Sequence, residues 1–127
     1  MKIPENLLYA ESHEWIKKDG NKLIVGISDY AQDKLGDIVF IDFLVDTGDA
    51  VEKGDPFAEL ESVKAVESVY APVTGTVTSI NTALDDDYSV INEDCYGDGW
   101  LIKIDPADAS ALDGLLKSDE YKNKLEE

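Results

Sequence analysis

The segment from Pro56 to Val77 reads PFAELESVKAVESVYAPVTGTV, and it contains two apolar-polar alternating runs with almost no turn residues between them. These runs, Phe57 to Val63 and Ala65 to Tyr70, have the period of two that is typical of strands with one buried face. Because the second run begins where the first ends, the chain must reverse tightly around Lys64. The pattern predicts a hairpin with a lysine at its tip.

The neighbours of Lys64 distinguish it from an ordinary charged surface residue. Those next to it are small or apolar, namely Ser62, Val63, Ala65 and Val66. They leave the amine projecting without an adjacent ion-pair partner, while Glu61 and Glu67 flank it three residues away on each side. Most exposed lysines are only solvated charges. The alternative is that a modifying enzyme recognises this tip by its shape.

The remaining pattern is also that of a β-rich domain. Further short runs rich in Val, Ile, Phe and Thr occupy Leu23 to Ile27, Asp37 to Val45, Gly75 to Ile80 and Trp100 to Ile104. Asp19-Gly20-Asn21 is expected to form a hairpin turn. The runs predict a mainly β sandwich or barrel, and the length of 127 residues predicts a single domain spanning residues 1–127.

Three short helices are expected beside the strands. The first covers Ser28 to Leu35, with Ser28 as N-cap and Gly36 as the C-terminal stop. Helical spacing of Leu112, Leu115 and Leu116 predicts a second. A final turn or two is expected from Ser118 to Leu125.

Composition excludes several classes of function. The chain has 28 acidic and 11 basic residues and a net charge of -17, which opposes binding to nucleic acid or to an anionic membrane surface. With one cysteine, Cys95, and one histidine, His13, it offers neither an intramolecular disulfide nor a Cys/His zinc site, so no metal is expected. His13 is interpreted as structural. The Met1 end lacks an apolar leader, so we expect a cytoplasmic, bacterial protein.

Six collinear segments resemble the H protein of the glycine cleavage system, a lipoyl carrier family. They are SHEW (Ser12 to Trp15), VGISDYAQDKLGDIVFID (Val25 to Asp42), GDAV (Gly48 to Val51), ESVKAVES (Glu61 to Ser68), APVTGTV (Ala71 to Val77) and INEDCYGDGWLIKI (Ile91 to Ile104). The chain departs from the family at Cys95, where proline is usual, which affects only the expected stiffness of that loop.

The resemblance implies a hammerhead or barrel-sandwich hybrid fold, like that of lipoyl domains, with flanking helices. It implies that Lys64 carries lipoic acid in amide linkage, with Glu61, Ser62, Val63, Ala65 and Glu67 as the context that a lipoate-attaching enzyme recognises. It also implies a non-catalytic carrier. The arm would take an aminomethyl group from glycine decarboxylase (P protein) to aminomethyltransferase (T protein) and be reoxidised by dihydrolipoamide dehydrogenase (L protein).

The residues agree with an external cofactor, because a disulfide/dithiol carrier needs two sulfurs and this chain has only Cys95. The loaded arm is labile in water, so a groove that shelters it is expected to hold a carboxylate for the cationic amine. The candidates are Glu14 with Ser12, and Glu67. An exposed strand charge is the alternative interpretation of Glu14.

Other functions remain open at this point. A lipoyl domain of a 2-oxoacid dehydrogenase or a biotin carrier is disfavoured, because these families usually present DKA or MKM where this chain has VKA. A lipoate donor in a relay to other enzymes also needs a modified Lys64. An unmodified binding scaffold and an autonomous enzyme are further alternatives. High like charge and the resemblance favour a monomer, with an acidic surface that keeps it in solution or steers it onto basic partners.

Overall fold

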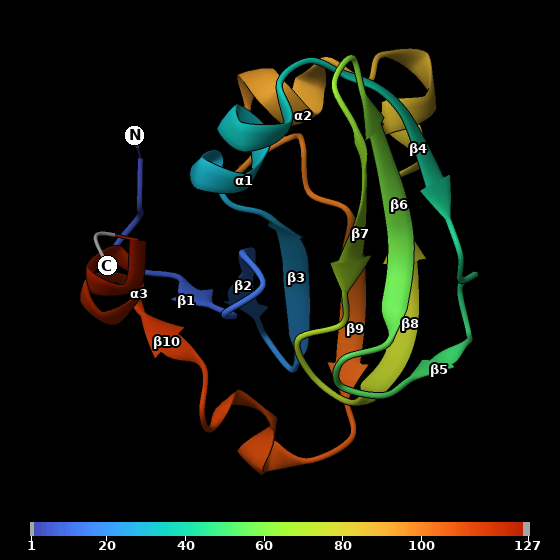
Figure 1. Ribbon diagram of the computed structural model, residues 1–127. Coiled ribbons are helices and arrows are strands. Elements are labelled where there is room, and N and C mark those ends of the chain that lie inside the picture. Colours follow the sequence, from blue (N-terminus) through green and yellow to red (C-terminus); the bar gives the residue numbers. More distant parts are fainter. Residues whose placement is uncertain (1, 126–127) are drawn as a thin grey trace.

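The computed structural model describes residues 2–125. It contains two antiparallel sheets (Figure 1). The larger sheet has the order β10-β1-β2-β3-β9-β8-β5. Its strands are β1 (Leu8–Tyr9), β2 (Glu14–Asp19), β3 (Lys22–Ile27), β5 (Ala50–Val51), β8 (Gly75–Ile80), β9 (Ile102–Pro106) and β10 (Leu116–Lys117). The smaller sheet is β4 (Ile38–Phe43), β6 (Pro56–Ser62) and β7 (Val66–Tyr70), in the order β4-β6-β7.

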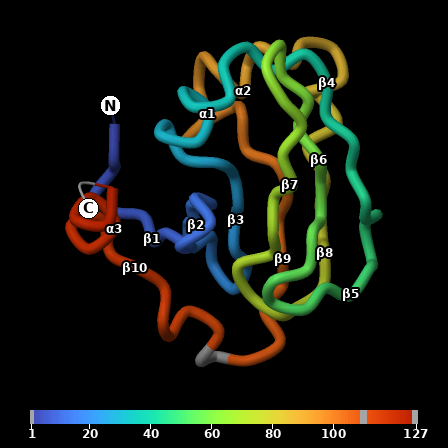
Figure 2. Tube along the Cα trace, viewed as in Figure 1, coloured from blue at the N-terminus to red at the C-terminus, as the bar shows by residue number. Residues whose placement is uncertain are grey.

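Short helices close the ends and one side of this structure. They are α1 (Asp29–Leu35), α2 (Val90–Glu93) and α3 (Ser118–Leu125), with 3-10 turns at η1 (Thr82–Asp86) and η2 (Ala109–Leu112). The trace in Figure 2 shows α1 and α2 at the end of the molecule where β6 and β7 meet, while α3 lies on the opposite side of β2 from the smaller sheet. The expected mainly β architecture with short helices and a C-terminal helix is confirmed.

The main core lies between the two sheets. Val25 of β3 and Ile104 of β9 face Leu60 of β6, and all three are fully buried within one apolar cluster. Such burial contributes about 1.5 to 3 kcal/mol for each large side chain. The core therefore holds the β6–β7 hairpin against the larger sheet.

A second cluster packs on the other face of the larger sheet. Tyr9 stacks on Tyr121 of α3 with ring centroids 4.6 Å apart, and Trp15 completes the cluster with Leu7. The Trp15 indole N–H donates to the Cys95 carbonyl at 2.8 Å, which fixes the loop at Cys95. This cluster attaches α3 to the sheet.

One expected helix is wrong. Leu112, Leu115 and Leu116 do not share a helix, since η2 ends at Leu112 and Leu116 belongs to β10. Gly114, at a φ of 89°, breaks the helical path between them, and Leu116 pairs with Tyr9 of β1. A strand pairing with the distant N-terminal segment therefore overrides the local spacing.

The other expectations need smaller corrections. The predicted strand from Asp37 to Val45 is shortened to β4, and the predicted strand from Trp100 starts at Ile102. The six expected strands omitted β2 and the two-residue strands. The Ser28 cap is confirmed, because its Oγ accepts a hydrogen bond from the Ala31 N–H.

Candidate functional site

The β6–β7 hairpin reverses in a turn that contains no glycine. Glu61 pairs with Val66, and the Ser62 N–H donates to the Ala65 carbonyl at 2.8 Å. The Ser62 hydroxyl oxygen also accepts hydrogen bonds from the N–H groups of Lys64 and Ala65, each at 3.1 Å. One serine side chain thus satisfies the backbone of the turn, which explains a tight reversal around Lys64.

Lys64 is exposed at the end of this turn, and none of the described residues forms an ion pair with its amine. Its side chain passes the C-terminal end of α1. There Gly36 has a φ of 78°, and a Cβ at Gly36 would lie 3.3 Å from Lys64 Cε. A backbone bond from Val63 N to the Asp37 carbonyl, at 3.1 Å, joins the turn to the start of β4. The lysine is therefore held beside α1 but open to solvent.

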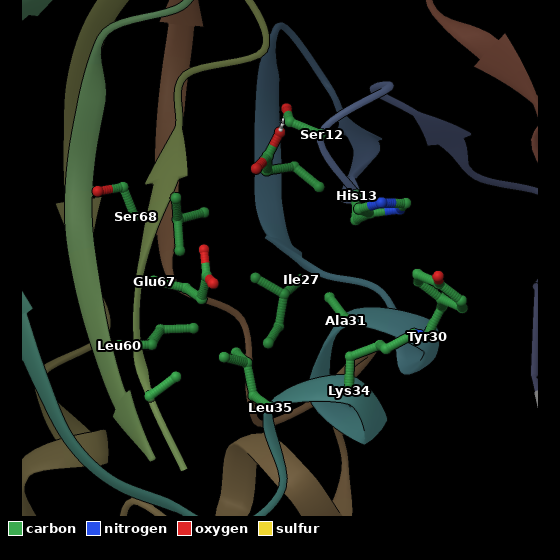
Figure 3. A pocket seen from close by; sticks show the side chains of 13 residues that line it. Ser12, His13, Ile27, Tyr30, Ala31, Lys34, Leu35, Leu60, Glu67 and Ser68 are labelled. Carbon is green, nitrogen blue, oxygen red and sulfur yellow. Dashed lines mark hydrogen bonds between the residues drawn. The ribbon is translucent and has the colours of Figure 1, made fainter. Parts of the chain in front are cut away.

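A pocket of about 400 Å³ begins next to this tip. Its walls come from α1, from β6 and β7, and from the loop that enters β2, as Figure 3 shows. The lining residues are Ser12, His13, Glu14, Ile27, Tyr30, Ala31, Lys34, Leu35, Leu60, Ala65, Glu67, Ser68 and Val69. The structure therefore brings together all three residues expected to shelter an arm, although they are as many as 55 positions apart in the sequence.

Glu14 is the buried acid of the pocket, with only 1% of its surface exposed. The Ser12 hydroxyl donates to its Oε1, and the Tyr70 N–H donates to its Oε2 at 3.3 Å. Burial raises the pKa of the Glu14 carboxyl in spite of these bonds. Within residues 2–125 no lysine pairs with it. Glu14 is thus not an exposed strand charge but a buried carboxyl that lacks a cation.

Glu67 occupies a different position in the same pocket. It lies opposite Leu60 in the β6–β7 register, so it shares the inward face of the small sheet even though β7 is an edge strand. Figure 3 shows its carboxylate directed from β7 toward the space in front of Ile27. An inward charge protects a sheet edge against further pairing, and here it also places a second carboxylate in the pocket.

A hydrogen-bonded chain that the sequence did not indicate supports the opposite wall. The hydroxyl of Tyr121 lies 2.8 Å from His13 Nδ1 and 2.7 Å from Ser28 Oγ. Ser28 Oγ also accepts a hydrogen bond from the Ala31 N–H, so this chain of contacts reaches the start of α1. Burial lowers the pKa of the His13 imidazole, which favours its neutral form.

His13, Tyr30 and Lys34 are among the lining residues that the sequence pattern did not place in the pocket. His13 has a φ of 79°, a backbone conformation that no local pattern revealed, and its ring packs 4.8 Å from that of Tyr30. Lys34 lies with its amine 5.5 Å from the Tyr30 ring centroid. The expected helix from Ser28 to Leu35 contained Tyr30 and Lys34, but nothing in it showed which side would face β7.

No group of three or more metal-ligating side chains is found among the described residues, and none of the helices described is long and apolar enough to cross a membrane.

Comparisons with known proteins give one consistent result. The family model of the glycine cleavage H-protein matches residues 7–127. The chain is 46% identical to the glycine cleavage system H protein of Halalkalibacterium halodurans, over 98% of this chain and 97% of that protein. It is 45% identical to the Listeria monocytogenes protein of the same name, over 99% of this chain and all of that one.

An archaeal relative and a crystal structure extend this similarity. A probable glycine cleavage system H protein of Haloarcula marismortui is 46% identical, over 98% of this chain and 97% of that protein. The crystal structure of a glycine cleavage system H protein from Mycobacterium marinum superposes with a TM-score of 0.89 and 35% identity, covering 98% of this chain and all of that chain.

Proposed function

The chain belongs to the glycine cleavage H-protein family, and on that premise we propose that it carries a lipoyl group on Lys64 and presents it to the other proteins of the system. It is a non-catalytic carrier component of the glycine cleavage system. The observation that carries the proposal is the exposed amine of Lys64 beside a pocket that holds a buried carboxyl without a cation.

The residues present fit such a group. Lys64 is exposed at a tip that an attaching enzyme can reach, and Ala65 next to it already lines the pocket. Apolar walls from Ile27, Leu35 and Leu60 suit an aliphatic chain. When bound, the lipoyl group supplies a disulfide/dithiol pair able to carry an aminomethyl unit. The buried thiol of Cys95 is no substitute, because it is a single sulfur and burial raises its pKa to about 12.

In this proposal Glu14 receives the cationic amine of the cargo. An ammonium next to a buried carboxyl replaces part of its lost hydration, so the carboxylate form becomes favoured and charge-assisted hydrogen bonds form. Ser12 holds Oε1 in place through its hydroxyl, and Tyr70 holds Oε2 through its backbone. Glu67 supplies the second carboxylate at the exposed edge. Keeping His13 neutral avoids a competing positive charge in the wall.

The proposed partners are glycine decarboxylase, aminomethyltransferase, dihydrolipoamide dehydrogenase and a lipoate-attaching enzyme. Membership of the glycine cleavage H-protein family supports these partners. In this proposal residues 1–127 act as one carrier domain in the cytoplasm.

Intact-mass spectrometry of protein made with lipoate available tests the proposal. We expect the mass of one lipoyl adduct, and peptide mapping should place it on Lys64. Lys64→Arg should abolish the adduct, whereas Lys22→Arg, at an exposed lysine in β3, should retain it. An adduct on another lysine, or no adduct on the unaltered chain, would overturn the assignment.

A further inference from the structure

Exposed apolar side chains gather around the lysine turn. Val63, next to Lys64, is 68% exposed, and Val66, where β7 begins, is 54% exposed. Val39 and Phe40 of β4 are 51% and 43% exposed. We call the surface made by these four residues and Glu61 the tip face. Soluble proteins rarely leave contiguous apolar side chains in water without a binding role.

Strand register places three of the five tip-face residues on one side of the small sheet. Phe40 lies opposite Glu61, and Glu61 lies opposite Val66, so the three form one row across the small sheet. The next row, Ile41 opposite Leu60, is buried in the core. Because neighbouring rows point to opposite faces, the Phe40 row points to solvent. Val63 follows Glu61 by two positions in the turn, where its N–H donates to the carbonyl of Asp37, the residue before β4.

The face is only partly covered by the rest of the chain. The ring of Tyr88 contacts that of Phe40 edge to face, with centroids 5.6 Å apart, and leaves Phe40 still substantially exposed. Tyr88 therefore supports the Phe40 ring while much of that ring remains available. Exposed aromatic rings are enriched at the centres of protein interfaces.

Carboxylates border the apolar part of the face. Glu61 lies within the row, and two positions further along Asp42 lies directly opposite Glu59 on the same side of the sheet. Like charges opposite each other destabilise a sheet. A partner with an apolar centre and flanking lysines or arginines would bury the valines and Phe40 and relieve this repulsion.

We propose that the tip face is the docking surface for the enzyme that acylates Lys64, a proposal that rests on the proposed function. That enzyme must bring its activated acyl group within bonding distance of Nζ. A lysine side chain is short, so the enzyme must touch residues next to Lys64. Enzymes that act at the far end of an attached arm have no such need. The exposed apolar residues lie around Lys64. They are therefore where an enzyme that reacts with Nζ must make contact.

The reaction assigned to this docked state is amide formation. With ATP and lipoate as co-reactants, the partner forms lipoyl adenylate and releases pyrophosphate. Nζ, after losing one proton to solvent, attacks the acyl carbon, and the C–N bond forms. The bond from that carbon to the phosphate oxygen breaks, AMP leaves, and the nitrogen loses a second proton. No electron is gained or lost in the exchange.

Steady-state kinetics of a purified lipoate ligase on the unmodified full chain tests the surface. Phe40→Ser should raise the KM for this chain about tenfold with kcat little changed, because docking is weakened and chemistry is not. Val66→Thr keeps the branched shape that suits a strand, so it tests the same face with little risk to folding. Val66→Thr should raise the KM of the ligase for this chain about threefold.

Leu44→Ser provides the matched control. Leu44 is 46% exposed, like Phe40, but it follows the end of β4 that is remote from the turn, and it should leave KM unchanged. Unfolding curves of all variants identify any loss of folded protein. Unaltered KM values for both face variants, or an equal rise with Leu44→Ser, would overturn the proposal. Failure of the unaltered chain to be acylated would instead overturn the proposed function.

A second assay separates this partner from the others. Lipoylated Phe40→Ser protein should serve glycine decarboxylase with the KM of the unaltered lipoylated chain. If its KM rises there while acylation is normal, the face belongs to the decarboxylase and the inference is wrong.

Discussion

At the scale of single residues, the site combines two side chains whose pKa values shift in opposite directions. Burial raises the pKa of the Glu14 carboxyl and lowers that of the His13 imidazole, and both therefore favour their neutral forms. They lie in one pocket wall, at neighbouring positions of the chain. An ammonium group beside Glu14 would favour its carboxylate form, against the effect of burial.

Glu14→Ala should speed the spontaneous loss of ammonia from the aminomethyl-loaded protein by about tenfold, because a charge-assisted hydrogen bond contributes about 1.5 to 3 kcal/mol. Ammonia release over time from isolated loaded protein measures this. Glu11→Ala is the control, because Glu11 is exposed and its carboxylate pairs with Lys124 at 3.0 Å. A decay rate equal to that of the unaltered chain would remove Glu14 from the sheltering role.

His13→Asn should lose more stability at pH 7 than at pH 5. A lowered pKa in the folded chain means that neutral His13 stabilises the fold above its unfolded pKa of about 6.5, and that this contribution is lost as pH falls through the folded value. Asn tolerates the φ of 79°. Urea unfolding of both proteins at several pH values gives the difference, whose slope cannot exceed about 1.4 kcal/mol per pH unit. A difference that does not vary with pH would contradict the assignment.

At the scale of elements, α3 stabilises the pocket although it contributes no lining residue. Its Tyr121 is 1% exposed and joins His13 to Ser28, the residue that caps α1. Burial raises the pKa of Tyr121 to about 12, so the hydroxyl keeps its proton. The last helix of the chain therefore positions both the loop before β2 and the start of α1.

Tyr121→Phe should destabilise the protein by about 1 to 3 kcal/mol, since the buried Ser28 and the half-buried His13 each lose a hydrogen-bond partner. Chemical denaturation measures the loss. Tyr88→Phe removes the same atom from a half-buried ring outside this chain of bonds and should cost less. Equal losses for the two variants would show that Tyr121 acts through ring packing alone.

At the scale of the whole molecule, the net charge of -17 acts on every partner. Such a field speeds encounter with basic surfaces and opposes self-association, which favours a monomer. Raising the ionic strength should therefore increase the KM of the lipoate ligase for this chain severalfold, because salt screens the attraction. A KM that stays flat from low to high salt would mean that the charge only maintains solubility.

Local sequence patterns were sufficient to predict the lysine hairpin, the cap of α1 at Ser28 and the final helix. Period, turn chemistry and capping involve residues only a few positions apart, so a short window contains all the groups that interact. The same reasoning failed between Leu112 and Leu116, where the partner strand β1 lies near the other end of the chain.

The burial of Glu14, the contact of Tyr121 with His13 across 108 positions, and the row from Phe40 to Val66 followed only from the packed structure. Each depends on which strands become neighbours and in which register, and that is settled by how the two sheets bury their apolar faces together. The exposed lysine turn can therefore be predicted from a short segment, whereas the pocket and the tip face exist only when distant segments meet.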